Sequence, residues 1–229
     1  MKGSDIVLLE MKDISLSYDE GKEYETVALN NINIRFNKNQ LTVITGPSGG
    51  GKSSLLYVLS GMRKPTSGEV VYQGESLYQM SRDKRANLRK QKIGFIFQRH
   101  FLIDYLSVID NIMLMSSKNV ENQREKAMVL LKKLELESFV NKRVFQLSVG
   151  QRQRVAIIRA LISEPNIILA DEPTASLDEK ISVQVMEILK EYSKKAAVLI
   201  VTHDMELLNY AQRIVEIKNA EIVKDELLH

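Results

Sequence analysis

The sequence predicts an α/β domain built on a mostly parallel β-sheet, with an antiparallel β section near the N-terminus and a helical section inserted later. Two observations predict it. Short apolar runs rich in β-branched residues lie next to helical patterns, which is typical of parallel strands buried between helices. A glycine-rich stretch joins one such run directly to a helical pattern. With 229 residues, 44% of them hydrophobic, the chain can bury a sizeable core and most simply forms one domain.

Four apolar runs are interpreted as buried strands of the parallel sheet: residues 41–45, 93–97, 166–170 and 197–201. Residues 9–18 and 31–36 instead alternate apolar and polar side chains, which indicates an antiparallel strand pair with one solvated face. The tail, residues 213–226, is expected to form a hairpin that turns near Asn219 and Ala220.

Between residues 99 and 146 the strand signal fades and helical periodicity replaces it. In residues 121–136 the apolar side chains fall on one helical stripe, formed by Ala127, Leu130, Leu131 and Leu134. We interpret residues 99–162 as a helical subdomain inserted between the two parts of the sheet domain, residues 1–98 and 163–229.

Composition excludes several kinds of protein. The charge is nearly balanced, with 32 basic and 29 acidic residues, so net charge indicates no particular partner. The chain has no cysteine, which excludes disulfides and thiolate metal sites. No apolar run approaches the roughly 18 residues of a membrane helix, and the N-terminus lacks the pattern of a signal peptide. We therefore expect a soluble, cytoplasmic chain whose membrane-spanning part, if it has one, is another chain.

The stretch GPSGGGKSS matches the phosphate-loop pattern G-x-x-x-x-G-K-[ST] at Gly46, Gly51, Lys52 and Ser53. It follows a predicted strand and leads into a helical pattern, which is the context that this motif requires. Glycines allow successive backbone N–H groups to point at phosphate oxygens, and the helix N-terminus adds partial positive charge. Lys52 is expected to bridge the β- and γ-phosphates, and Ser53 to bind Mg²⁺. A chance glycine-rich turn is the alternative interpretation.

Two acids, Asp171 and Glu172, end the apolar run at residues 166–170. Adjacent residues of a strand point to opposite sides, so one carboxylate can face a metal while the other faces a different spot. Asp171 is expected to hold Mg²⁺ and Glu172 to polarise the attacking water. An ordinary solvated strand end is the alternative, and it would be favoured if the phosphate loop were absent.

Two more polar residues, Gln98 and His203, follow predicted strands. Because ligands bind at the carboxyl ends of parallel strands, His203 is a candidate donor to the γ-phosphate. A lone histidine is, however, more often structural than catalytic. The uncharged amide of Gln98 can contact both Mg²⁺ and the attacking water, but by itself it identifies no site.

A second candidate anion site opens the helix that begins near residue 149. Ser148 and Gln151 form an S-x-x-Q capping pattern ahead of an apolar-periodic helix, and Gly150 leaves the backbone open between them. A well-capped helix is the plain interpretation, but a helix N-terminus can also hold a phosphate that a partner molecule brings. Ser176 and Glu179 repeat the capping pattern ahead of another helix. Its predicted buried stripe is Ile181, Val185, Ile188, Leu189 and Tyr192.

Taken together, these motifs resemble the nucleotide-binding subunit of an ABC transporter over nearly the whole chain and in the family's order. GPSGGGKS resembles its Walker A motif, IILADE its Walker B motif and LSVGQ its signature motif. Gln98 resembles the Q-loop residue, residues 176–178 the D-loop and His203 the switch histidine. Tyr18 lies where the family places an aromatic residue against adenine. The resemblance implies a RecA-like P-loop NTPase core.

The resemblance also implies ATP hydrolysis, with each ATP shared between two copies of the chain that associate head to tail. The Walker A motif of one copy would face the signature motif of the other. The implied roles are as follows: ATP contacts by Tyr18, Gly46, Pro47, Ser48, Gly49, Gly50, Gly51, Lys52, Ser53 and Ser54; contacts in trans by Ser148, Gly150, Gln151 and Asp178; Mg²⁺ ligation by Ser53, Gln98 and Asp171; catalysis by Glu172, His203, Gln98 and Lys52.

The finer resemblance is to the macrolide-exporter and lipoprotein-releasing (MacB/LolD-like) branch. It implies a separate integral membrane permease as partner, a position on the cytoplasmic face of the membrane, and export or extraction of peptides, drugs or lipoproteins. A mechanical or signalling ATPase that acts on a membrane partner without moving a solute is the alternative. A soluble ABC ATPase that acts on ribosomes or DNA fits less well, because the chain has one such domain and no heptad run.

Three positions depart from the family pattern: Gly50 and Ser54 in Walker A, and Val149 in the signature motif. A β-branched residue tolerates fewer backbone angles than glycine, so we expect Val149 to weaken contacts in trans and slow turnover. A basic cluster at residues 81–92 is either a nucleic-acid patch or a solvated helix face. The lack of interleaved aromatic residues favours the helix face, and we expect no nucleic-acid partner.

Overall fold

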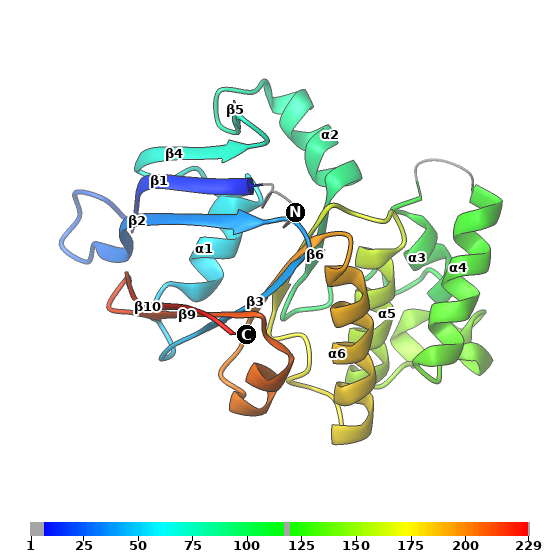
Figure 1. Cartoon of the computed structure of the whole chain (residues 1–229). Helices are drawn as coiled ribbons and strands as arrows, with labels where there is room; N and C mark the ends of the chain where they lie inside the picture. Colours follow the sequence, from blue (N-terminus) through cyan, green and yellow to red (C-terminus); the bar gives the residue numbers. More distant parts are fainter. Residues whose placement is uncertain (1–6, 117–119, 229) are drawn as a thin grey trace, which may run out of the picture.

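Two β-sheets and the helices packed on them make up the fold (Figure 1). The computed structural model describes residues 7–116 and 120–228. The larger sheet has six strands in the order β10-β9-β3-β8-β7-β6. They are β3 (Gln40–Thr45), β6 (Ile93–Ile96), β7 (Ile167–Asp171), β8 (Ala197–Val201), β9 (Arg213–Lys218) and β10 (Glu221–Leu227).

The larger sheet is parallel except for its edge strand β10, so the predicted parallel core is confirmed. Each of the four predicted strands is present with ends within one residue of those expected. The expected hairpin is also present. Its turn residues Asn219 and Ala220 have φ of 51° and 65°, as a two-residue type I′ turn requires. Because β3, β6, β7 and β8 are parallel, their carboxyl ends meet at one edge of the sheet.

The smaller sheet is antiparallel and has the order β2-β1-β4-β5. It contains the predicted pair, β1 (Val7–Tyr18) and β2 (Thr26–Asn37). It is extended by β4 (Ser67–Tyr72) and β5 (Glu75–Ser76), which the sequence analysis missed. These two strands are short, and only two residues of β4 are buried, so they carry little hydrophobic pattern.

Two cores lie on opposite faces of the larger sheet. Along β3, β7 and β8, successive side chains enter one core and then the other, as the pleat of a strand requires. Helix α1 (Lys52–Leu59) is buried between the two sheets, with its leucines in the core shared with β1 and β2. Helices α5 (Val149–Leu161) and α6 (Glu179–Ser193) cover the other face (Figure 1).

The inserted section is helical, as expected. Helices α3 (Val108–Met113) and α4 (Val120–Lys133) pack on α5, with short 3₁₀ turns at Glu137–Phe139 and Val144–Gln146. The predicted stripe of Ala127, Leu130, Leu131 and Leu134 is buried there. These helices lie at the end of the molecule away from the smaller sheet (Figure 1). The subdomain boundaries at residues 99 and 162 remain a prediction.

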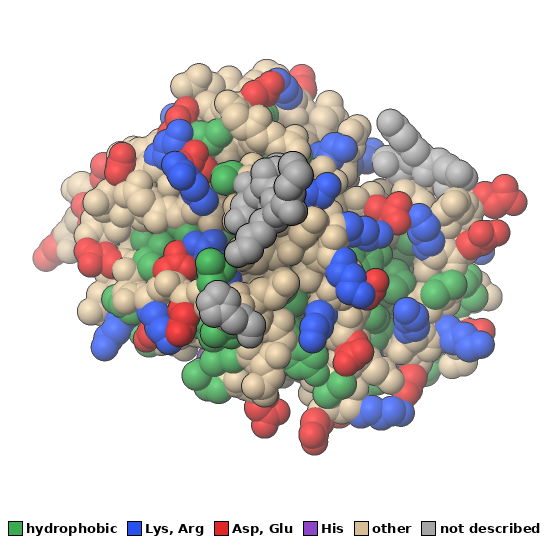
Figure 2. Space-filling model, in the orientation of Figure 1, with side chains coloured by type: hydrophobic (Ala, Val, Ile, Leu, Met, Phe, Trp, Pro, Cys, Tyr) green, Lys and Arg blue, Asp and Glu red, His purple; other side chains and the backbone are tan. Residues whose placement is uncertain are grey.

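The basic cluster forms helix α2 (Arg82–Lys92), which begins after the N-cap Ser81 and has no buried residue. The interpretation of this cluster as a solvated helix face is therefore confirmed. Over the face of the molecule drawn in Figure 2, basic and acidic side chains are interspersed rather than gathered by sign. Among the described residues, no helix combines the length and apolar character needed to cross a bilayer.

Candidate nucleotide-binding site

The loop after β3 covers residues 46–51. At two positions, Gly46 and Gly51, its backbone requires glycine. Gly46 has φ of +139°, and a Cβ there would lie 1.9 Å from the carbonyl oxygen of Ile217 in β9. Gly51 has φ of +102°, and a Cβ there would lie 2.1 Å from the carbonyl oxygen of Ala28 in β2. The loop is thus pressed against one strand of each sheet, which fixes its curvature.

Lys52 lies at the first position of α1 with its side chain turned back into this loop. Its Nζ donates hydrogen bonds of 2.8 Å to the carbonyl oxygens of both Gly46 and Pro47. The residue is only 8% exposed. An ammonium group is therefore held inside the concave side of the loop, beside the partial positive charge of the α1 N-terminus.

Asp171, the last residue of β7, faces this loop. Its Oδ1 accepts a hydrogen bond of 3.1 Å from the hydroxyl of Ser53. Burial raises the pKa of the Asp171 carboxyl and the neighbouring Glu172 carboxylate raises it further, while the Ser53 hydroxyl and Lys52 act in the opposite direction. The two residues that the sequence analysis expects to bind Mg²⁺ are therefore in contact.

Glu172 points away from Asp171, toward the end of the neighbouring strand β8. Its Oε2 accepts a hydrogen bond of 3.1 Å from Thr202 Oγ1. Its Oε1 accepts one of 3.1 Å from the backbone N–H of His203 and lies 2.7 Å from Nδ1 of the same residue. With an ionised Glu172, the Nδ1 contact requires that this nitrogen carry the proton. The opposed directions of the two acids agree with the prediction.

The backbone of Glu172 has φ of +49°, a left-handed conformation that is uncommon for a residue other than glycine. Such strain persists only where the surroundings determine it, and here three hydrogen bonds hold the carboxylate. The side chain of Glu172 is 12% exposed, whereas that of His203 is 75% exposed. Thr202 gave no signal in the sequence, because its role depends on which strand lies beside β7.

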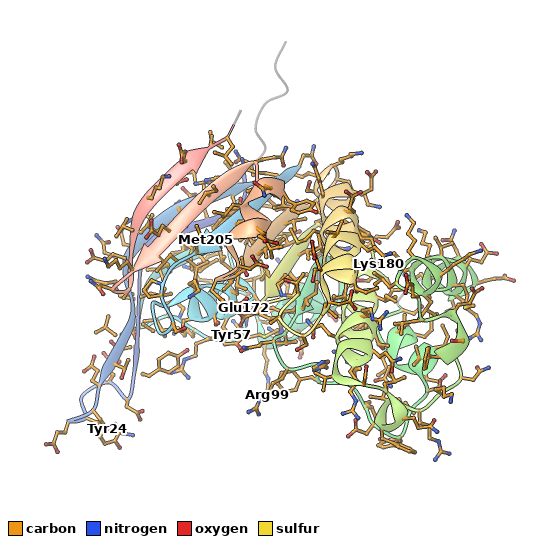
Figure 3. All side chains as sticks on the ribbon, turned by 90° about the horizontal axis from the view of Figure 1, so that it is seen from below. Tyr24, Tyr57, Arg99, Glu172, Lys180 and Met205 are labelled. Atoms are coloured by element: carbon orange, nitrogen blue, oxygen red, sulfur yellow. The ribbon has the colours of Figure 1, made fainter. Side chains whose placement is uncertain are left out.

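Glu172 and His203 open onto a groove of about 950 Å³. The groove runs between α6 and the 3₁₀ helix η3 (Met205–Tyr210), beyond the end of the sheet. In Figure 3, Glu172 lies near the centre of the molecule with Met205 on the η3 side of it. The carboxylate that the sequence predicts as a base is therefore accessible from this side.

Tyr18, at the end of β1, lies against the start of α1. Its hydroxyl is 3.1 Å from Ser54 Oγ, and the guanidinium carbon of Arg63 lies 4.8 Å from the centre of its ring. Arg63 was not singled out in the sequence. Gln98, by contrast, is exposed in the loop that follows β6. Tyr18 thus lies beside the end of the phosphate loop, and Gln98 follows the carboxyl end of the parallel strand β6.

The predicted capping box at the start of α5 is confirmed. Ser148 Oγ accepts from the N–H of Gln151 at 3.2 Å, and Gln151 Oε1 accepts from the N–H of Ser148 at 2.8 Å. Gly150 packs so closely on the next segment that a Cβ there would lie 2.9 Å from the carbonyl oxygen of Ser176. Among the described residues, no hydrogen bond joins Ser148, Gly150 or Gln151 to the loop at residues 46–54.

The predicted cap of α6 was wrong. The N-cap is Asp178, whose Oδ1 accepts from the N–H of Ile181 at 3.0 Å, and not Ser176. The helix begins two residues later than predicted because the Asp178 carboxylate accepts from a backbone N–H of its first turn. The buried stripe of α6 is as predicted, with Tyr192 half-buried at its end.

The structure does not support the reason for which Val149 was expected to weaken contacts in trans. It is the first residue of α5, it is 59% exposed, and its φ is not positive. The backbone at this position therefore does not require glycine, so the expected loss through restricted backbone angles does not arise within the chain. An effect of Val149 on contacts in trans stays a prediction.

Comparison with known proteins agrees with this geometry. The sequence model of the family described as ABC transporter matches residues 29–175. The lipoprotein-releasing system ATP-binding protein LolD of Buchnera aphidicola is 39% identical over 225 residues, covering 96% of this chain and 98% of that protein. A protein named as the putative hemin import ATP-binding protein HrtA, from Staphylococcus epidermidis, is 41% identical and covers 93% of this chain and 98% of its own.

A solved structure is also similar to this chain over nearly its whole length. It is the dimeric ATP-binding cassette MJ0796, described as a post-hydrolysis state bound to ADP and Pi. It superposes with a TM-score of 0.90 at 36% identity, covering 97% of this chain and 99% of that one. The phosphate loop, the paired acids and the capped α5 therefore belong to a fold that is shared over nearly its whole length. The chain belongs to the ABC transporter family as an ATP-binding cassette, an ATPase whose relatives couple hydrolysis to transport.

Proposed function

We propose that this cassette powers a separate integral membrane permease from the cytoplasmic face of the membrane, and that the pair exports or extracts peptides, drugs or lipoproteins. The observation that carries the proposal is the opposed pair Asp171 and Glu172 at the end of β7, one facing the phosphate loop and the other held by Thr202 and His203. LolD is named for lipoprotein release and HrtA for hemin import, so relatives of similar identity serve different cargoes. The cargo is therefore chosen by the permease.

In this proposal the loop at residues 46–54 holds the triphosphate of ATP. Its backbone N–H groups and the N-terminus of α1 bind phosphate oxygens, and Lys52 exchanges its two carbonyl partners for the β- and γ-phosphates. Tyr18 stacks on adenine. Because Arg63 lies over one face of the Tyr18 ring, the base uses the other face.

The residues present fit a Mg²⁺ ion. The Ser53 hydroxyl and the Asp171 carboxylate lie 3.1 Å apart and are hard oxygen donors of the kind that Mg²⁺ prefers. Ser53, Asp171 and Gln98 would hold it. When bound, Mg²⁺ offsets the negative charge of the phosphates. The buried Asp171 carboxyl has a raised pKa, so a cation beside it also favours its ionised form.

Glu172 acts as the general base in this proposal. Hydrogen bonds from Thr202 and from the His203 backbone fix its carboxylate, so that it orients a water and accepts its proton. The His203 imidazole is exposed and touches Glu172, so it can turn toward the γ-phosphate while it remains near the base. Both residues stand at the open end of the groove beside α6.

The second half of each site comes from another copy of the chain. Ser148, Gly150 and Gln151 present a capped helix N-terminus that makes no hydrogen bond to the phosphate loop of its own chain among the described residues. A helix N-terminus of this kind binds anions. Asp178 lies close by, since the carbonyl of Ser176 packs on Gly150. The dimeric form of MJ0796 bound to ADP and Pi supports an association of two copies. ATP then drives closure because it has different affinities for the closed and open states.

Mixing two inactive variants tests this shared site. Lys52→Ala removes the phosphate lysine, and Ser148→Arg blocks the capped end of α5. Each variant alone should hydrolyse ATP at least about 100-fold more slowly than the unaltered chain. A mixed dimer contains one intact site, so the mixture should regain activity that rises with protein concentration.

Sites built within one chain would give no recovery in this mixture. A specific activity that does not depend on concentration, in a chain shown to be monomeric with ATP, would also contradict the shared site. The Ser148→Arg chain mixed with itself is the matched control, because it contains no intact site.

Capture from membranes tests the permease. A Glu172→Gln chain loaded with ATP is used as bait on gently solubilised membranes of the native cell, with Lys52→Ala as the matched control, and bound proteins are identified by mass spectrometry. We expect a polytopic membrane protein that the control retains less well. Its extracytoplasmic domains would also distinguish transport from mechanical signalling. Recovery of ribosomal proteins alone would overturn the transporter assignment.

A further inference from the structure

The loop that carries Gln98 is bound to α5 by one side chain of the loop and one side chain of the helix. We call residues 97–101 the Gln98 loop. Arg159, in the last turn of α5, donates from Nη1 to the carbonyl oxygen of Phe101 at 2.7 Å and from Nη2 to that of His100 at 2.9 Å. One guanidinium therefore binds two successive peptide groups, which fixes the direction of the loop as well as its position.

Arg159 is half-buried where it makes these two contacts. This partial burial lowers the pKa of the Arg159 guanidinium, because the charged form is less well solvated there. A partly desolvated cation is costly unless its donors find acceptors, and the two loop carbonyls accept from two of its N–H groups. A solvated arginine in a surface groove would gain little from the same contacts.

The backbone of the Gln98 loop is strained where Arg159 holds it. Phe101 has φ of +44°, a left-handed conformation that is rare for a bulky residue. Its ring packs edge-on to Phe97 at 5.0 Å, and Phe97 stacks in turn on Phe95 of β6 at 4.1 Å. A conformation of this kind persists only when surrounding contacts determine it. The loop is thus held at a set shape between the sheet and α5, with Arg99 projecting outward (Figure 3).

A second contact reaches the other end of α5. His100 Nε2 lies 2.9 Å from the carbonyl oxygen of Val149. A carbonyl oxygen can only accept, so the ring donates from Nε2. Val149 stands between Ser148 and Gly150, two of the residues proposed to contact nucleotide in trans. The Gln98 loop therefore touches α5 near its last turn through Arg159 and in its first turn through His100.

We propose that Arg159 and His100 are positioning residues that join Gln98 to the signature end of α5, so that a displacement of either is passed to the other. The inference rests on the proposed function, in which Gln98 serves the nucleotide of its own chain and Ser148 that of the partner copy. It follows that the two residues link the two ATP sites of a dimer through a single chain. Neither residue touches nucleotide in this scheme.

A double-mutant cycle tests the link. Arg159→Lys keeps the charge but cannot bind two carbonyls at once. It should lower kcat for ATP by about tenfold with little change in KM, and Gln98→Ala should lower kcat similarly. Because Arg159 acts through Gln98, the double variant should be no slower than Gln98→Ala alone.

Arg152→Lys is the matched control for this cycle. Arg152 is also on α5, and it donates to two backbone carbonyls, those of Leu147 and Phe145, which lie outside the Gln98 loop. Its effect on kcat should add to that of Gln98→Ala. If the Arg159→Lys effect also adds in full, the link between Arg159 and Gln98 is overturned.

Hydrogen exchange provides a readout that is independent of catalysis. In Arg159→Lys and in His100→Phe, amides at residues 98–102 and 149–155 should both lose protection, by about fivefold or more, while those of α6 keep theirs. His100→Phe alters an exposed contact and so leaves the fold intact. Loss of protection confined to residues 98–102 would overturn the coupling to α5. Coupled loss of protection in a chain that shows no ATP hydrolysis would instead overturn the proposed function and leave the physical link standing.

Discussion

Replacing Glu172 by Gln is expected to lower kcat for ATP hydrolysis by about 100-fold or more, since that is the range for removal of a general base. Gln has nearly the same size, and its amide oxygen can still accept from Thr202 or from the His203 backbone. What is lost is the charge and the ability to take a proton. ATP binding should therefore persist, and the variant should accumulate as an ATP-bound dimer.

The measurement combines steady-state hydrolysis with size-exclusion chromatography coupled to light scattering, with and without ATP. Glu179→Gln is the matched control. Glu179 lines the same groove and stands in the first turn of α6, but it is exposed and joins no acid–histidine contact. Its loss removes only a favourable helix-end charge, about 0.3–1 kcal/mol. Turnover near that of the unaltered chain in Glu172→Gln would remove Glu172 from the role of base.

Replacing Gly46 by Ala is expected to abolish ATP binding and to destabilise the fold by about 2–5 kcal/mol, the sum of a left-handed backbone penalty and a steric clash. The new Cβ would lie 1.9 Å from the carbonyl oxygen of Ile217, a backbone atom of the sheet that cannot move aside cheaply. Either β9 or the loop must shift. A shift of the loop also displaces the Gly46 carbonyl that holds Lys52.

Gly49→Ala is the matched control, because Gly49 also has a positive φ, +77°, but open space around its Cβ. It should cost only the backbone penalty of about 1–2 kcal/mol. Thermal unfolding and the Kd for a fluorescent ATP analogue measure both effects. For a chain of this length, each kcal/mol corresponds to about 2–4 °C in Tm. Equal losses in the two variants would show that contact with β9 does not shape the loop.

Local pattern was sufficient to predict four strands of the larger sheet, the phosphate loop and the capping box at Ser148. Each depends on residues close together in the chain. The β-branched runs, the glycine spacing and the S-x-x-Q pattern carry their own physical reason, and each is present. The wrong cap of α6 came from the same kind of reasoning, because the pattern of Ser176 and Glu179 was taken as the cap, whereas Asp178 caps the helix.

Contacts between distant segments could not be predicted in the same way. Thr202 and His203 meet Glu172 because β7 lies beside β8 with Asp171 opposite Val201. The sequence of a single strand does not determine which strand lies beside it, so the pairing of β7 with β8 could not be predicted. Arg159 was invisible for another reason. It is charged and lies on an amphipathic helix, where an arginine is ordinarily solvated.

The strand order of the larger sheet has a consequence for how the protein is made. Strand β3, which leads into the phosphate loop, lies between β8 and β9, and both of these are synthesised after it. Gly46 rests on Ile217, which lies in β9, far behind Gly46 in the sequence. During translation, therefore, the loop is complete in sequence long before its supports leave the ribosome. Since non-local strand pairs form late, the nascent chain cannot hold ATP in the mature way until β8 and β9 have emerged.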